Sequence, residues 1–183
     1  LNRIFQGQSG NARYYWANLE AWQTIAFFLT EMFKVEFPEK QSEIKYRSEG
    51  YVNQILDLQK FVFRKTQQLD LEKHRCITND PALLTLIEFM QLQCQFISLT
   101  NDMPDAEFIN ILKEFSGRHS NVLFSSPFYD QEAVNKLGDI ALTQGIVTTI
   151  FPHVYIMNVG EGAESDTYYN IITKVVNSLV EAL

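Results

Sequence analysis

The side chains that could do acid–base or metal chemistry are few and do not fall into a known pattern. The sequence has three histidines, His74, His119 and His153, and none of them has the HExxH, HxxxE or ExxH spacing of recognised zinc and di-iron sites. The nucleotide-binding motifs GxGxxG and GxxxxGK[ST] and the hydrolase motif GxSxG do not occur either. We therefore expect a protein that is not an enzyme and that has no cofactor and no metal site.

The two cysteines, Cys76 and Cys94, lie 18 residues apart without a CxxC or CxxC…H pattern. Such cysteines are typical of buried, reduced thiols in a cytoplasmic protein, and a disulfide or a metal-binding pair is the alternative. No apolar run approaches the roughly 18 residues that span a bilayer, and no signal peptide is visible. We therefore expect a cytoplasmic protein without a membrane segment. The first residue is Leu1 and not Met, so we expect that an upstream part has been removed or omitted.

The composition is that of a globular protein rich in phenylalanine. Hydrophobic residues make up 46% of the 183 residues, and 14 residues are Phe. A chain of this length forms one domain, or a small domain joined to a larger one, and it can bury a core and still line a cavity with apolar side chains. The net charge of −7 argues against a surface built entirely for phosphate backbones, but it is compatible with a small basic DNA-binding end.

Hydrophobic residues recur at spacings of three and four along almost the whole sequence, whereas alternating strand patterns are scarce. This spacing predicts an all-α helical bundle. Thr78-Asn79-Asp80-Pro81 and Asp130 are predicted to cap helices, and Pro152 is predicted to kink or end the helix in which it lies. The predicted helices cover residues 19–33, 42–68, 71–76, 82–99, 106–115, 131–157 and 167–183, and residues 116–127 are predicted to be irregular.

The predicted helix 82–99 carries Gln91, Gln93 and Gln95 among apolar residues on nearly all sides. A helix this apolar is central in a bundle, so some of these amides are predicted to be buried and to need hydrogen-bond partners. In a cavity they would orient a bound molecule whose bulk is held by Phe and Met side chains. Alternatively, they face neighbouring backbone groups or water, and the sequence leaves both arrangements open.

The segment Gly10–Trp22 resembles the signature of the TetR (tetracycline repressor) family, in which the end of a DNA recognition helix runs into the first helix of the regulatory domain. The matching residues are Gly10, Asn11, Tyr14, Asn18, Glu20 and Ala21. Leu19 and Tyr15 depart from the family pattern, which has lysine and histidine there. The last two predicted helices resemble the pair through which members of this family dimerise.

The resemblance implies a ligand-responsive transcriptional regulator, a repressor, that binds operator DNA as a homodimer and is tuned by a small apolar or amphipathic ligand. Residues 1–18 would be the remnant of a helix-turn-helix domain, and residues 19–183 an all-helical ligand-binding and dimerisation domain. The implied DNA contacts are Ser9, Asn11, Arg13, Tyr14 and Tyr15. The implied ligand cavity is lined by Phe61, Phe89, Met90, Gln93, Phe96, Phe124 and His153. The implied dimer interface consists of Leu137, Ile140, Ala141, Gln144, Ile172, Val175, Val176 and Leu179.

Two other functions stay open on the sequence alone. A helical protein–protein interaction module without DNA binding would be a monomer with an exposed apolar groove. A small enzyme or carrier would use an apolar pocket with at least one acid or base of strongly shifted pKa.

Overall fold

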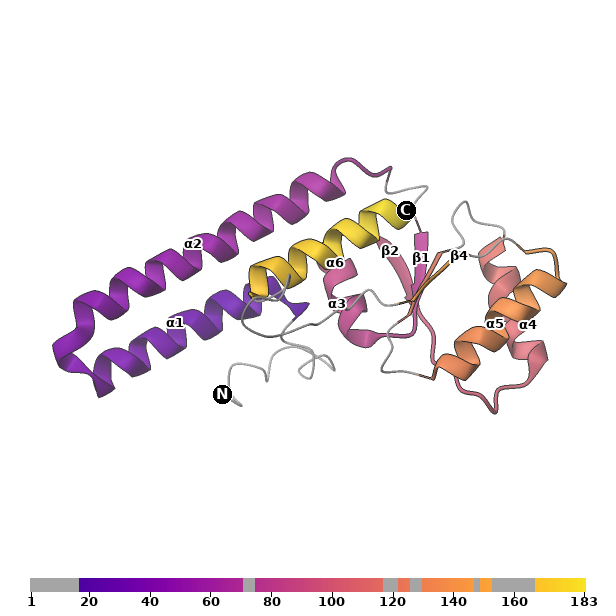
Figure 1. The fold of residues 1–183 in the computed structure, drawn as a ribbon, viewed down its shortest axis with the longest axis horizontal. Coiled ribbons are helices and arrows are strands. Elements are labelled where there is room, and N and C mark those ends of the chain that lie inside the picture. Colours follow the sequence, from indigo (N-terminus) through magenta and orange to yellow (C-terminus); the bar gives the residue numbers. More distant parts are fainter. Residues whose placement is uncertain (1–16, 71–74, 117–121, 126–129, 147–148, 153–166) are drawn as a thin grey trace.

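The computed structural model describes residues 17–70, 75–116, 122–125, 130–146, 149–152 and 167–183. It has a long helical hairpin at one end and a four-stranded parallel sheet with helices on both faces at the other (Figure 1). The last helix, α6 (Tyr168–Ala182), packs against the hairpin. The protein is therefore α/β, and the all-α bundle expected from the sequence is wrong.

The hairpin is formed by α1 (Leu19–Glu36) and α2 (Gln41–Thr66), with a short 3-10 helix, η2 (Pro38–Lys40), between them. The side chain of Asn18 accepts two backbone hydrogen bonds from the first turn of α1, both at 3.0 Å, and so caps this helix. α1 ends before Phe37, because a following proline disfavours helical backbone. The hydroxyl groups of Thr30 on α1 and Ser48 on α2 are hydrogen-bonded, which ties the two helices together.

The sheet consists of β1 (Arg75–Thr78), β2 (Gln93–Phe96), β3 (Val122–Ser125) and β4 (Thr149–Pro152), in the spatial order β2-β1-β3-β4. All neighbouring strands are parallel. The connections between successive strands contain α3 (Pro81–Phe89), α4 (Asp105–Ser116) and α5 (Gln131–Thr143). Parallel strands require crossover connections of this kind, and the β-α-β order is that of a doubly wound sheet.

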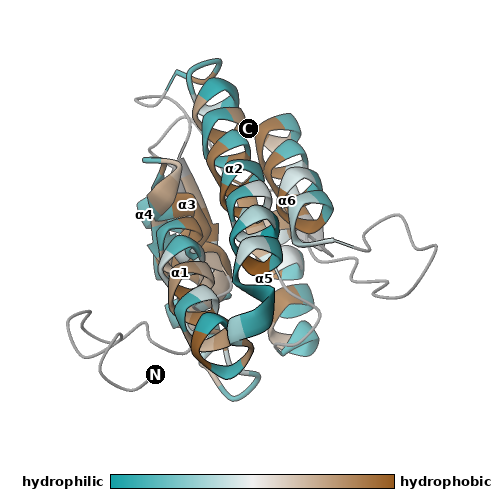
Figure 2. Ribbon diagram, turned by 90° about the vertical axis from the view of Figure 1, so that its left-hand side faces the viewer, coloured by the Kyte–Doolittle hydropathy of each residue, from teal (hydrophilic) through white to brown (hydrophobic). Residues whose placement is uncertain are grey.

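Successive residues of the central strands point to opposite faces of the sheet and enter two separate hydrophobic cores. Cys76 and Phe124 belong to a core shared with α2, α3 and α6, whereas Ile77 and Leu123 belong to a core shared with α4 and α5. Figure 2 shows α2 and α6 side by side, with hydrophobic and hydrophilic residues alternating along each helix. This pattern is expected of helices that bury one face and expose the other.

All four strands lie where the sequence predicted helix or irregular chain. The predicted helix 82–99 ends at Phe89, because Gln91 adopts a positive φ of 57° and the chain then continues into β2. The predicted helix 131–157 ends at Thr143, and Gly145, with φ at 67°, directs the chain away from the helix axis before β4. The predicted caps at Asp80 and Asp130 are confirmed.

The two helices expected to form a dimerisation pair lie on opposite faces of the sheet. α5 packs with α4, whereas α6 packs with α2 (Figure 1). Six of the eight residues of the implied interface are buried in the chain's own cores, Ile140 is partly buried there, and Gln144 is exposed. The buried residues are Leu137, Ala141, Ile172, Val175, Val176 and Leu179. These side chains stabilise a single copy of the chain and are not presented to a second one.

Asp80, the N-cap of α3, lies in the short connection between β1 and this helix. Asp80 is 3% exposed and accepts hydrogen bonds from the backbone N–H groups of Ala82 and Leu83 at 2.8 and 3.3 Å. We predict that Asp80→Ala lowers the free energy of unfolding by about 1–2 kcal/mol, because buried helix donors lose their acceptor. Urea denaturation followed by circular dichroism measures this change. Asp139→Ala, at an exposed position of α5, is the control and should change stability by less than about 0.5 kcal/mol. Equal losses in the two variants would contradict the prediction.

α6 also contacts the hairpin through the rings of Trp22 and Tyr168, whose centroids lie 4.8 Å apart. Burial raises the pKa of Tyr168 above its usual value of about 10, and the neighbouring Tyr51 adds to this shift. The neutral phenol therefore stabilises the fold fully below pH about 10, and this contribution is lost as the pH rises further, because the unfolded chain ionises first.

We accordingly predict that the urea midpoint of the wild type falls more steeply above pH about 10 than that of Tyr168→Phe. Tyr46→Phe, at a residue that is 78% exposed, is the control and should retain the wild-type slope. Identical slopes in all three proteins would show that Tyr168 does not contribute.

Candidate functional site

The carboxyl ends of β1 and β3 mark the point where the strand order of the sheet reverses. From β1 the chain crosses over to β2 on one side, and from β3 it crosses over to β4 on the other side. The connections therefore leave the two adjacent strand ends in opposite directions. Ligands of open α/β sheets bind at such topological switch points, which makes this edge the first place to look for a site.

Hydroxyl groups fix the two strand ends relative to each other. Thr78, the last residue of β1, donates a hydrogen bond of 3.0 Å from Oγ1 to the backbone carbonyl of Phe124 in β3. The same oxygen accepts a bond of 3.0 Å from the backbone N–H of Asp80. Ser125, the last residue of β3, accepts a hydrogen bond of 3.3 Å from Nε2 of Gln131 at the start of α5. The hydroxyl groups of Thr78 and Ser125 therefore serve to hold the ends of β1 and β3 in place.

Asn79 is the polar residue at this edge whose hydrogen-bonding capacity is unused. It follows β1 directly and is 4% exposed, yet neither its Nδ2 nor its Oδ1 has a hydrogen-bond partner. A buried polar group without a partner costs about 1–3 kcal/mol, so such groups are rare unless they have a function. The amide can donate from Nδ2 and accept at Oδ1, and it therefore fits a solute that carries both an acceptor and a donor.

The neighbouring carboxylate is already in use. Asp80 Oδ1 accepts the two backbone hydrogen bonds that cap α3, and the residue is almost fully buried. Its negative charge lies at the positive end of the helix dipole, where it is stabilised. Asp80 therefore acts in the structure as a helix cap, and the amide of Asn79 is left without a hydrogen-bond partner.

The described residues do not form a metal site. Among them, no three His, Cys, Asp or Glu side chains come close enough together to hold a metal ion. Directly after β3 the sequence reads Ser126-Pro127-Phe128-Tyr129, and after β1 the carboxylate of Asp80 caps a helix, whereas His153, directly after β4, lies outside the described residues. Transition-metal sites in proteins use three or four ligands of these types, and the described residues do not bring that number together.

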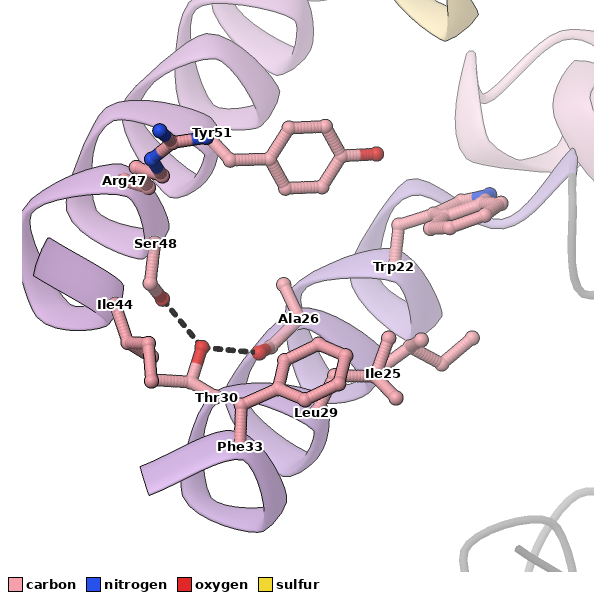
Figure 3. A pocket seen from close by; sticks show the side chains of 10 residues that line it. All are labelled: Trp22, Ile25, Ala26, Leu29, Thr30, Phe33, Ile44, Arg47, Ser48 and Tyr51. Carbon is pink, nitrogen blue, oxygen red and sulfur yellow. Dashed lines mark hydrogen bonds between the residues drawn. The ribbon is translucent and has the colours of Figure 1, made fainter. Parts of the chain in front are cut away.

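A second concave region lies between the two helices of the hairpin. It is an almost entirely apolar groove of about 290 Å³, open to solvent, at the end of the hairpin far from the sheet (Figures 1 and 3). Apolar residues of α1 line one side of it. The lining residues are Trp22, Ile25, Ala26, Leu29, Thr30, Phe33, Ile44, Arg47, Ser48 and Tyr51. Its polar groups are already paired: Thr30 bonds Ser48 and the carbonyl of Ala26, and Arg47 forms an ion pair with Glu43.

The residues of the implied ligand cavity do not line one cavity, although four of them, Phe61, Phe89, Met90 and Phe124, belong to the same hydrophobic core. Phe89 and Met90 line a groove of about 360 Å³ between the end of α2 and the end of α3. Phe61 is partly buried on α2, Phe124 is fully buried in β3, and Gln93 and Phe96 are exposed on the edge strand β2. His153 lies outside the described residues, as do the five implied DNA contacts, Ser9, Asn11, Arg13, Tyr14 and Tyr15.

The sequence around Asn79 indicates the start of a helix but does not indicate the strand that precedes it. Thr78-Asn79-Asp80-Pro81 was correctly predicted as a helix start, but the residues before it were predicted as helix. A polar pair between a buried strand and a helix start is typical of a ligand-binding edge in an α/β sheet. Without β1 in the prediction, the same pair indicated a cap and nothing more.

Comparison with known proteins identifies the fold. No protein-family model matches the sequence, and no curated protein matches it. Among solved structures, the chain is similar to the periplasmic zinc-binding protein TroA from Treponema pallidum, with a TM-score of 0.75 and 20% identity over 92% of this chain and 62% of TroA. It is also similar to the metal-dependent lipoprotein YcdH from Bacillus subtilis, with a TM-score of 0.73 and 15% identity over 96% of this chain and 66% of YcdH. A periplasmic metal-binding protein from Candidatus Liberibacter asiaticus has a TM-score of 0.64 and 12% identity, over 92% of this chain and 62% of that protein. The chain thus has the α/β fold of these metal-binding proteins and spans between 62% and 66% of their lengths.

This fold overturns the resemblance to the TetR family. The segment Gly10–Trp22 matched a short motif by chance, because the chain that follows forms a parallel sheet and not a helical bundle. The implied transcriptional regulator, operator DNA, homodimer and apolar effector depended on that resemblance and are withdrawn with it. The expected cytoplasmic location is corrected as well, since the solved proteins of this fold are described as periplasmic proteins and a lipoprotein.

Within the part of the chain that the structure describes, none of the helices combines the length and the apolar character that crossing a membrane requires.

The state of Asn79 gives a stability prediction. Asn79→Leu removes both unpartnered atoms and keeps the side-chain shape, so we expect the ligand-free protein to keep its free energy of unfolding or to gain about 1 kcal/mol. Thr78→Val, which removes a hydroxyl with satisfied hydrogen bonds, is the matched comparison and should lose about 1–2 kcal/mol. Urea denaturation of extensively dialysed protein measures both. A loss in Asn79→Leu as large as that in Thr78→Val would show that the amide is structural.

Proposed function

We propose that this chain is a solute-binding protein that works outside the cytoplasm, has no catalytic activity, and holds its solute at the carboxyl ends of β1 and β3. The observation that carries this proposal is the buried, unpartnered amide of Asn79 at the topological switch point. A solute that accepts a hydrogen bond from Nδ2 and donates one to Oδ1 stabilises this amide, at the place where open α/β sheets bind their ligands.

The fold supports both the type of protein and its location. The solved structures that share it are described as periplasmic metal-binding proteins and a metal-dependent lipoprotein. The described part of the edge supplies hydrogen-bonding groups without a paired acid and base, since the carboxylate of Asp80 caps α3. Such a site can hold a solute and release it unchanged, but it lacks the groups that acid–base catalysis requires.

The chemistry of the edge favours a small polar organic solute as the cargo. An amide oxygen does bind hard cations, but always together with carboxylates or several other oxygens. Around Asn79 the described residues provide no such set, and the hydroxyl groups of Thr78 and Ser125 are engaged in positioning the strands. A metal ion is the second candidate, because the solved proteins of this fold are described as binding metal ions.

The proposal is tested by asking what the protein carries. Native mass spectrometry of the full chain, purified from its own cell envelope without refolding, should show one bound molecule per chain, which denaturation releases for identification by mass. Asn79→Leu should carry none, whereas Asp139→Ala, far from the edge, should carry it like the wild type. If wild type and Asn79→Leu are both empty, and neither is stabilised thermally by sugars, amino acids or small carboxylates, the proposed function is wrong.

Titration calorimetry separates the two candidate cargoes. After dialysis against EDTA, we expect Zn²⁺ and Mn²⁺ to bind the protein no more tightly than about 1 mM, because the described residues do not bring three ligands together. One-to-one binding in the micromolar range or tighter would replace the organic solute by a metal ion and leave the solute-binding class of the protein intact.

A further inference from the structure

The two cysteines, which are far apart in the sequence, are direct neighbours in the sheet. Cys76 in β1 and Cys94 in β2 are register partners in the parallel pair of strands. Both side chains enter the same hydrophobic core, and both residues are free cysteines. Residues paired in register on neighbouring strands point to the same face of the sheet, so the two thiols lie next to each other.

Strand spacing brings the two residues within the reach of a covalent bond. Neighbouring strands lie about 4.8 Å apart, and disulfides join residues whose Cα atoms are about 4.4–6.8 Å apart. β2 is an edge strand that pairs with β1 alone. A small shift of its backbone toward β1 therefore disturbs a single ladder and allows the two Cβ atoms to approach each other.

We propose that Cys76 and Cys94 form a disulfide that fastens the edge strand β2 to β1 when the chain folds in oxidising surroundings. The oxidant is a small disulfide such as oxidised glutathione. One protein thiolate attacks a glutathione sulfur and releases one glutathione thiolate, and the second protein thiolate then displaces the other glutathione from the mixed disulfide. Two protein thiols thus lose two electrons and two protons, and one glutathione disulfide becomes two glutathione thiols.

The burial of the pair determines when the bond forms. In the folded protein the hydrogen bond to Cys76, together with burial, raises the pKa of Cys94, so little thiolate is present to attack an oxidant. Cys76 is itself 1% exposed, and Cys94 is partly buried. The disulfide therefore forms during folding, while the thiols are still accessible, and the completed core afterwards shields it from soluble reductants.

Oxidative refolding of the full chain tests this proposal. The unfolded protein is diluted into a glutathione redox buffer or into dithiothreitol, and recovery of the fold is followed by circular dichroism. We expect the oxidised product to be 2 Da lighter, to resist alkylation at both cysteines, and to yield one peptide that links Cys76 to Cys94. Its melting temperature should exceed that of the reduced protein by about 5–10 °C. Cys76→Ala and Cys94→Ala should show no difference between the two buffers.

Two free thiols per refolded chain in the glutathione buffer would overturn the proposal, and so would disulfides that join two chains. Peptide mapping of the wild-type chain exported to a bacterial periplasm is a second readout that requires neither refolding nor a variant. Because the disulfide depends on the pairing of β1 with β2 and not on the solute, its absence would leave the proposed function untouched, and an empty solute site would leave the disulfide untouched.

Discussion

The parallel pairing of β1 with β3 is the interaction on which the rest of the structure depends. β1 lies between β2 and β3, so its backbone groups are bonded on both sides, and Thr78 adds a side-chain bond of 3.0 Å to the carbonyl of Phe124 at the far end of the pair. The same pairing separates the crossover toward β2 from the crossover toward β4. The position of the candidate site is therefore a consequence of strand order, and a change of strand order would remove the switch point together with the fold.

The pairing also determines how the helices are distributed. Because adjacent residues of β1 point to opposite faces, Cys76 enters one core and Ile77 the other, and each core needs its own cover of helices. α4 and α5 cover one face. α3 and α6 cover the other, and α6 holds the hairpin through its contact with α2 and the tilted ring contact of Tyr168 with Trp22. None of the other described helices or strands covers the far end of the hairpin, and Phe27 and Val35 on α1 are 66% and 82% exposed.

The sequence predicted the helices better than the sheet, for a physical reason. Helix ends have local chemistry, so Asp80 and Asp130 marked their caps correctly. The strands are four residues long and are buried on both faces in the centre of the sheet, so β3 is continuously buried and shows no alternation. Gln93-Cys94-Gln95-Phe96 does alternate, but it follows a strongly apolar helix without a Gly or Pro between them. The break comes instead from Gln91 at a φ of 57°, a conformation that its residue type does not indicate.

The strand order brings together residues that no local pattern connects. Asn79 lies next to the end of β3 only because the chain leaves β1, builds β2 outside it and returns on the other side. The same return places Cys94 beside Cys76. In this arrangement the residues that hold the strand ends, Thr78 and Ser125, are distinct from Asn79, whose amide has no hydrogen-bond partner. A fold with this division can exchange its cargo by changing one or two residues after a strand while the strand ends stay fixed. The chain can therefore share the fold of metal-binding proteins although its described residues fit a metal ion poorly. The fold and the choice of ligand depend on different residues.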